Sequence, residues 1–252
     1  MDYTVAAVDE AVKLLLLVAQ QPGLGLSEVA RRSGTGKARA FRLLTTLEQR
    51  DLVRRRGEPA TYHLGFQALH LGAAAQSQID LVQLSQEPLE RLLNEFNETV
   101  AVRVRDGLET VCVARRESTQ SLRVHGEIGH RRPLHAGASS KLLLAHASDD
   151  VLQAVLAGER TRFTEQTLVA KAALLAELRQ VRERGHAHSQ GERSAGTAAI
   201  AVPIKDGSGE VVAALGLSAP ATRMTTKHRR AYLSALADQA AVISRGLGYR
   251  EA

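Results

Sequence analysis

The spacing of apolar residues in the first fifty positions predicts three helices separated by short turns. The first helix spans 6–20 and ends at Pro22-Gly23. The second is short, with Ser27 as its N-cap and Arg32 at its end. A tight turn at 33–36 leads into the third helix, over 37–50. The apolar positions of the three helices are Val8, Val12, Leu15, Leu16 and Ala19, then Val29 and Ala30, then Ala40, Leu43, Leu44 and Leu47.

The third helix is polar and basic on the face opposite its apolar positions. Two short helices joined by a glycine turn, the second of them basic, are typical of a helix-turn-helix that enters the major groove of DNA. The next run, LVRRRGEPATYHLG at 52–65, predicts a β-hairpin wing whose arginines can follow a phosphate backbone. The residues expected to contact DNA are Lys37, Arg39, Arg42, Thr45, Arg54, Arg55 and Arg56.

The same glycine turn has a second interpretation, as a phosphate-binding loop. Such a loop needs a glycine five residues before the glycine of its Gly-Lys pair and a Ser or Thr directly after the lysine. Arg31 and Ala38 occupy these two positions. The dinucleotide-binding pattern fails as well, because Arg39 stands where its third glycine belongs. The turn therefore favours DNA over a nucleotide, and we expect no cofactor.

Beyond residue 65 the pattern alternates between helices and strand pairs. Because strand pairs are interrupted by helices, we predict the α+β class, with an antiparallel sheet in the C-terminal part. Pro88 is able to split the second of these helices. The expected domains are a winged helix-turn-helix at 1–65, a linker helix at 66–79 and an effector-binding domain at 80–252. The expected elements are helices at 66–77, 81–96, 138–146, 150–156, 171–184 and 225–246, a strand at 122–125, and hairpins at 99–115 and 198–218.

Composition and charge narrow the class of protein further. Hydrophobic residues form 44% of the 252 positions and charged residues 24%, as in soluble globular proteins. No apolar run reaches the ~18 residues that span a bilayer. The acidic start lacks the basic region of a secretory signal, and the single cysteine, Cys112, excludes an internal disulfide. We therefore expect a cytoplasmic protein.

The positive charge of the chain is concentrated in one window. The formal net charge is +6, whereas residues 31–56 alone contain nine basic and two acidic residues, a net of +7. The rest of the chain is close to neutral. A local basic patch of this kind suits double-stranded DNA as a partner, although a solvated charged face would give the same count.

Three motifs resemble those of the IclR family of bacterial transcription regulators, in the same order along nearly the whole chain. LSEVARRSGTGKARAFRLLTTLEQRDLVRR, at 26–55, is similar to the helix-turn-helix of that family. RRPLHAGASSKLLLA at 131–145 and ALGLSAP at 214–220 resemble two motifs of its C-terminal domain. The resemblance implies a winged helix-turn-helix, a linker helix and a GAF-like α/β effector-binding domain. It also implies dimers or tetramers that bind pseudo-palindromic operators of catabolic genes as repressors or activators, in response to a small organic or aromatic acid.

Several positions depart from the family pattern, some of them in the expected effector site and two in the predicted DNA-binding helix. Ser139-Ser140 replaces a hydrophobic residue and a glycine, Ser189 replaces an acid and Gly216 a serine, and Ala38-Arg39 replaces Ser-Thr in the DNA-reading helix. A helix start favours an anion, so we expect the carboxylate of an acid there, facing an apolar wall. The alternative is simple N-capping by Ser139. The residues expected to bind the effector are His135, Ala136, Gly137, Ser139, Ser140, Ser189, Ala199, Leu215 and Leu217.

Two further classes of protein fit less well. An enzyme would need a nucleophile, a base and an orienting group, and neither the pattern G-x-S-x-G nor S-x-x-K surrounds Ser139. A metal sensor would have to use His186 and His188, with Glu192 nearby, which is too few ligands to define a site. We therefore expect no enzymatic activity and no metal.

Overall fold

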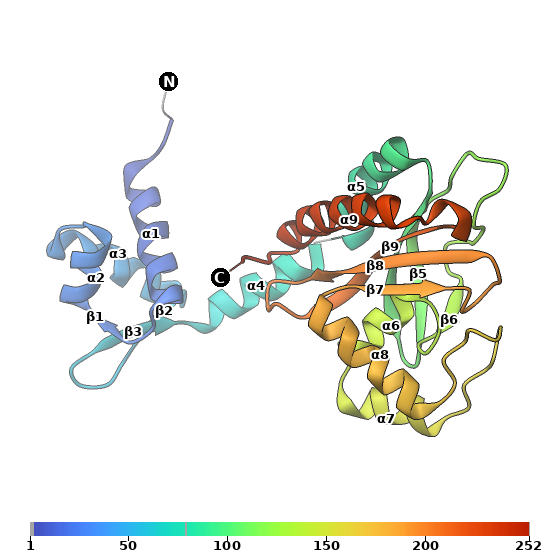
Figure 1. Cartoon of the computed structure of the whole chain (residues 1–252). Helices are drawn as coiled ribbons and strands as arrows, with labels where there is room; N and C mark the ends of the chain where they lie inside the picture. The colour runs from blue at the N-terminus through green and yellow to red at the C-terminus, as the bar shows by residue number, and fades with distance from the viewer. Residues whose placement is uncertain (1–2, 79, 252) are drawn as a thin grey trace. The chain divides into compact units, whose positions relative to one another are not determined.

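The computed structural model describes residues 3–78 and 80–251 (Figure 1). Contacts within the chain divide it into two compact units, of which the first ends at Gln78. Within the described ranges, no helix is both long enough and apolar enough to cross a membrane.

The first unit is a winged helix-turn-helix followed by a helix. Its strands pair in the order β1-β3-β2, and the second and third of its helices are joined by a turn in which Gly34 has a φ of 71°. That left-handed conformation suits glycine and explains its place in the turn. The elements are α1 Ala6–Gln20, β1 Leu24–Gly25, α2 Leu26–Ser33, α3 Lys37–Gln49, β2 Val53–Arg56, β3 Thr61–Leu64 and α4 Phe66–Gln78.

Two local expectations for this unit were wrong. Ser27 is not an N-cap, because α2 begins two residues earlier than expected, at Leu26, with Gly25 in the cap position. The reason is β1, which pairs Leu24-Gly25 with β3 and thereby fixes where the helix starts. In α1 the buried residues are Leu14 and Val18, and of the predicted apolar positions Leu15 is partly buried and packs against this core. The exposed fractions of Val8, Val12 and Leu16 are 61%, 47% and 49%, so α1 carries an apolar stripe on its surface.

The second unit is an antiparallel sheet covered by helices on both faces (Figure 1). The strands follow the order β6-β5-β4-β9-β8-β7, so the chain returns to the centre of the sheet after its helices. The elements are α5 Leu81–Phe96, β4 Thr99–Asp106, β5 Glu109–Arg116, β6 Arg131–Pro133, α6 Ala138–Ala145, α7 Asp149–Ala157, α8 Lys171–Arg184, β7 Ala187–Gln190, β8 Thr197–Lys205, β9 Val211–Pro220, the short helix η1 Ala221–Arg223 and α9 Thr226–Gly246.

Here too the structure corrects the predicted elements in places. Residues 122–125 form no strand; they belong to a long connection, and the edge strand is β6 instead. The helix at 81–96 is continuous through Pro88, which is buried together with Leu89 and Leu92. Packing of this face outweighs the hydrogen bond that the proline cannot donate.

The two faces of the sheet have separate cores, and side-chain alternation along the strands assigns residues to them. Leu215 and Leu217 of β9 pack with α5 and α9. Ala214 of the same strand packs with α6, α7 and α8 on the other face. This division determines which residues can reach a cavity next to α6.

A close backbone approach at Gly65 connects the wing to α4. A Cβ atom at this position would lie 2.0 Å from the carbonyl oxygen of Asp51, whereas a Cβ at Gly36 would meet nothing within 4 Å. We predict that Gly65→Ala destabilises the first unit by about 1–3 kcal/mol, because the backbone has to move. Gly36→Ala, the control, should change stability by less than about 0.5 kcal/mol. Calorimetry of the full-length protein measures the stability of both variants. Equal losses of stability would contradict the conclusion that the close approach at Gly65 requires a glycine.

Candidate functional site

The basic surface of the first unit lies on α3 and the wing. Three of the arginines expected to contact DNA are held by acids of the same unit. Arg39 pairs with Glu10 of α1, and Arg55 of β2 pairs with Glu48 of α3. The third, Arg54, pairs with Asp51 and lies 4.3 Å from the centre of the Phe66 ring. These pairs are exposed, and exposed ion pairs contribute only about 0–1 kcal/mol, so a phosphate can replace the acid.

Other cations of this surface are exposed without such a pair. Among the described residues, none forms a hydrogen bond or an ion pair with the side chains of Lys37, Arg42 or Arg56. Thr45 is partly exposed, and its hydroxyl donates to the carbonyl of Phe41. Lys37 and Arg42 come from the exposed face of α3 and Arg56 from the wing, so helix and wing both present free positive charge.

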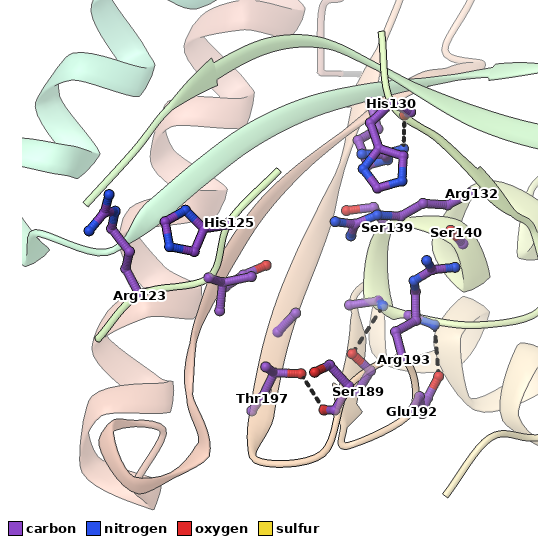
Figure 2. Close-up of a pocket in the computed structure, with 18 residues that line it drawn as sticks. Arg123, His125, His130, Arg132, Ser139, Ser140, Ser189, Glu192, Arg193 and Thr197 are labelled. Carbon is purple, nitrogen blue, oxygen red and sulfur yellow. Dashed lines mark hydrogen bonds between the residues drawn. The ribbon is translucent and has the colours of Figure 1, made fainter. Parts of the chain in front are cut away.

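The second unit contains a pocket of about 420 Å³ between the start of α6 and the end of the sheet at β8 and β9 (Figure 2). Five of the residues expected to bind an effector line it, namely Gly137, Ser139, Ser140, Ser189 and Ala199. The remainder of the wall contains four arginines and two histidines. It includes Arg103, Arg123, His125, His130, Arg132 and Arg193.

The expectation of an apolar wall was wrong. Leu215 and Leu217 do not line the pocket, because strand alternation turns both toward α5 and α9 on the other face of the sheet. The β9 residue that does line it is Ser218. His135 and Ala136 also lie outside the lining: Ala136 is fully buried, and the His135 ring bonds to the carbonyl of Thr161 and stacks on Phe163.

The start of α6 has both occupied and unoccupied backbone donors. The N–H of Gly137 donates to the carboxylate of Glu192 at 2.8 Å, and the N–H of Ala138 donates to the hydroxyl of Ser189 at 3.2 Å (Figure 2). For the N–H groups of Ser139 and Ser140, the described residues provide no acceptor. Ser139 does not cap the helix; Gly137 holds the N-cap position. Two donors at the positive end of a helix therefore remain available to a ligand.

A buried ion pair lies beneath this helix start. The ammonium of Lys141, which is 1% exposed, contacts Glu192 at 2.5 Å and Glu177 at 3.1 Å. Arg184 also pairs with Glu177. Burial raises the pKa of Glu177, but Lys141 and Arg184 together outweigh it and lower the pKa. Since Glu192 binds both Lys141 and the N–H of Gly137, it connects α6 to the loop after β7.

The basic lining residues were missed because they come from separate parts of the chain. Arg103 lies in β4, Arg132 in β6 and Arg193 in the loop after β7. One signal was present: Arg103 stands between Val102 and Val104, in a strand whose other residues are largely apolar. An arginine inside such a strand is rarely buried without a role.

The chemistry of the pocket is that of binding. No histidine or carboxylate of the described residues is hydrogen-bonded to the hydroxyl of Ser139 or Ser140; the hydroxyl of Ser140 lies 3.4 Å from that of Thr110. The ammonium of Lys141 is engaged by Glu177 and Glu192, and Lys141 does not line the pocket. Within the described ranges, no three His, Cys, Asp or Glu side chains cluster as metal ligands do. A winged helix-turn-helix joined to such a pocket defines a class, the ligand-binding DNA-binding regulators.

Comparison with known proteins gives the family. Residues 73–245 match the description "Bacterial transcriptional regulator IclR C-terminal", and residues 7–57 match "IclR helix-turn-helix domain". The chain belongs to the IclR family of bacterial transcriptional regulators. It is a transcription regulator rather than an enzyme.

Individual relatives cover nearly the whole chain. The HTH-type transcriptional regulator KdgR of Escherichia coli K12 is 31% identical over 249 residues, 98% of this chain and 95% of KdgR. The regulator BhcR of Paracoccus denitrificans is 33% identical over 98% of this chain and 89% of its own length. The crystal structure of the repressor BlcR of Agobacterium tumefaciens has a TM-score of 0.80 at 27% identity, over 99% of this chain and 100% of BlcR. The crystal structure of Thermotoga maritima IclR has a TM-score of 0.65 at 27% identity, over 97% of this chain and 99% of the IclR chain.

The ion pair beneath α6 yields a stability prediction. Lys141→Met leaves Glu192 and Glu177 without their buried cation, so the free energy of unfolding should fall by about 3–5 kcal/mol. Arg184→Met removes a more exposed partner of the same Glu177 and should lower it by at most about 1 kcal/mol. Urea unfolding followed by circular dichroism measures both variants. A Lys141 variant no less stable than the Arg184 variant would mean that the pair does not support the fold.

Proposed function

We propose that the first unit binds operator DNA and that the second unit binds a small anionic effector that alters this binding. The observation that carries the proposal is the pocket: its lining is basic, and it ends at two unoccupied N–H groups of a helix start, those of Ser139 and Ser140. Such donors and charges suit an anion. Control of catabolic genes by an organic acid, which the family resemblance implies, is consistent with this chemistry.

For DNA, the proposal assigns base contact to α3 and phosphate contact to the wing. Arg42 is exposed on α3 and has no partner among the described residues, so its guanidinium is available for a guanine edge. Lys37 and Thr45 lie on the same helix. Arg56 of the wing is likewise available for phosphate. Arg39, Arg54 and Arg55 would exchange their acids for phosphates or bases when DNA binds.

For the effector, the proposal places a carboxylate at the start of α6. The free N–H groups of Ser139 and Ser140 donate to it, and Ser189 and Ala199 lie on the wall nearby. Gly137 shapes the approach, because its φ of 95° turns the chain into the helix. An acidic residue at position 189 would repel such a carboxylate, and serine does not.

For assembly, the proposal is at least a dimer. One winged helix covers too few base pairs for tight specific binding, and paired modules read half-sites about one helical turn apart. The exposed apolar stripe of α1, formed by Val8, Val12 and Leu16, is suited to pairing. Leu69 and Leu71 of α4 are also exposed, at 67% and 54%.

The roles of Arg42 and Arg56 can be separated by measuring how substitution of each residue changes the affinity for operator DNA and for unrelated DNA. An operator is first obtained by randomised-site selection with the wild-type protein. Arg42→Ala should weaken operator binding by ~1–3 kcal/mol while leaving binding to unrelated DNA nearly unchanged, because a base contact is lost. Arg56→Ala should weaken binding to both DNAs similarly and lower the salt slope by ~0.9.

Arg91→Ala serves as the control, because Arg91 is an exposed residue of α5 in the second unit that pairs with Glu87. It should leave DNA binding unchanged. If selection recovered no preferred sequence, or if the Arg42 variant kept the full preference, the assignment to α3 would be wrong.

A further inference from the structure

Three guanidinium groups reach the pocket from three separate elements. Arg103 comes from β4, Arg132 from β6 and Arg193 from the loop after β7. Arg132 and Arg193 lie on the same side of the pocket as Ser139 and Ser140, whereas Arg123 lies across from them (Figure 2). Positive charge therefore gathers beside the start of α6.

The arginines differ in how they are held. Arg103 is 4% exposed, and it donates to the hydroxyl and carbonyl of Thr110 and to the carbonyl of His130. None of these acceptors carries a charge. The side chains of Arg132 and Arg193 form no hydrogen bond or ion pair with any described residue, and the Nε of Arg132 and the Nη1 of Arg193 are buried without an acceptor. Arg193 only lies over the Phe163 ring, 4.3 Å from its centre.

No acid of the pocket balances these charges. Among the described residues, the one carboxylate in the lining belongs to Glu192, and both of its oxygens are engaged, by Lys141 and by the N–H of Gly137. Glu177 contacts Lys141 and Arg184 and does not line the pocket. Three cations thus share a partly buried space in which no anion is free.

Burial is the main cause of a lowered pKa in all three arginines, and repulsion between them acts in the same direction on Arg103 and Arg132. Burial, followed by the charges of Arg103 and Arg193, lowers the pKa of Arg132 to about 10. Burial also lowers the pKa of Arg103, and the charge of Arg193 acts in the same direction. The pocket thus holds positive charge that is partly removed from water and has no counter-ion among the described residues of the lining, an arrangement that costs stability.

From this arrangement we infer that the effector is a small organic molecule with at least two negative charges. A single carboxylate would leave most of the positive charge unpaired, whereas a dianion lets guanidinium groups and the free N–H groups of α6 each find an acceptor. The lining contains no Phe, Tyr or Trp, and its apolar part is limited to Val124, Ala138, Ala198 and Ala199. It therefore offers little to an aromatic ring. A dicarboxylate and a phosphate monoester share the required charge.

The inference rests on the proposed function and names the class of its ligand. The test titrates the full-length protein with matched probes: succinate, glutarate and adipate as dicarboxylates, glycerol 3-phosphate as a phosphate ester, and butyrate and benzoate as monoanions. Calorimetric titration and thermal shift measure binding. We expect at least one dianion to bind at least about tenfold more tightly than either monoanion. The preferred dianion shows whether the site takes a dicarboxylate or a phosphate ester.

Variants locate the site. Arg132→Gln and Arg193→Gln should each weaken binding of the preferred dianion roughly 10- to 100-fold, because a charge-assisted contact is lost. Arg131→Gln is the matched control: Arg131 neighbours Arg132 on β6 but is exposed and pairs with Asp106 and Glu109. It should leave dianion binding unchanged.

A purely structural role would give a different result. If Arg132 and Arg193 only supported the fold, their glutamine variants would melt at lower temperature without ligand. The inference predicts that the unliganded variants melt at the same temperature as the wild type or higher, because repulsion is relieved. The inference is overturned if no dianion binds, if monoanions bind equally well, or if the Arg131 variant loses as much affinity as the other two. A monoanion that binds and alters operator affinity would overturn only the inference that the effector carries two negative charges. Failure of the protein to bind operator DNA would overturn the proposed function itself.

Discussion

The second unit depends on one buried contact, the ion pair between Lys141 and Glu192. Lys141 projects from α6 into a region where it is 1% exposed, and Glu192 meets it from the loop after β7. The same carboxylate accepts from the N–H of Gly137, so it fixes the first turn of α6 as well. Since a buried cation needs a partner, Glu192 is committed to the fold and is not available to the arginines next to it.

Because Glu192 is engaged in this way, it does not neutralise the positive charge of the pocket. Arg103 is held by neutral oxygens, and Arg132 and Arg193 have no acceptor among the described residues. Preorganised donors of this kind favour an anion, because the fold already holds them in place and they need not rearrange when the anion binds. The exposed ion pairs of the first unit are different, since those of Arg39 and Arg55 are weak and can be exchanged for phosphates. The first unit thus carries exposed ion pairs that are replaceable, and the pocket of the second unit holds a fixed excess of positive charge.

Local patterns predicted much of the fold, and long-range pairing accounts for what they missed. The helix over 171–184 ends where Gly185 takes a left-handed conformation, and both long hairpins follow from apolar runs around turn residues. The edge strands β1, β6 and β7 are short, and β1 pairs with β3, which follows only after two helices and another strand. In the pocket, the serines were recognisable at a helix start. The leucines of β9 were assigned to the wrong face because the spacing of one strand does not say which face meets α6.

We expect an anion bound among these arginines to change the affinity of the protein for operator DNA. The direct measurement is a thermodynamic cycle in which operator affinity is measured with and without a saturating dianion, and dianion affinity with and without operator. Linkage requires the dianion to change operator affinity by the same factor by which the operator changes dianion affinity. We expect this factor to be at least about five. A dianion that binds tightly in the pocket while operator affinity stays unchanged would contradict the account.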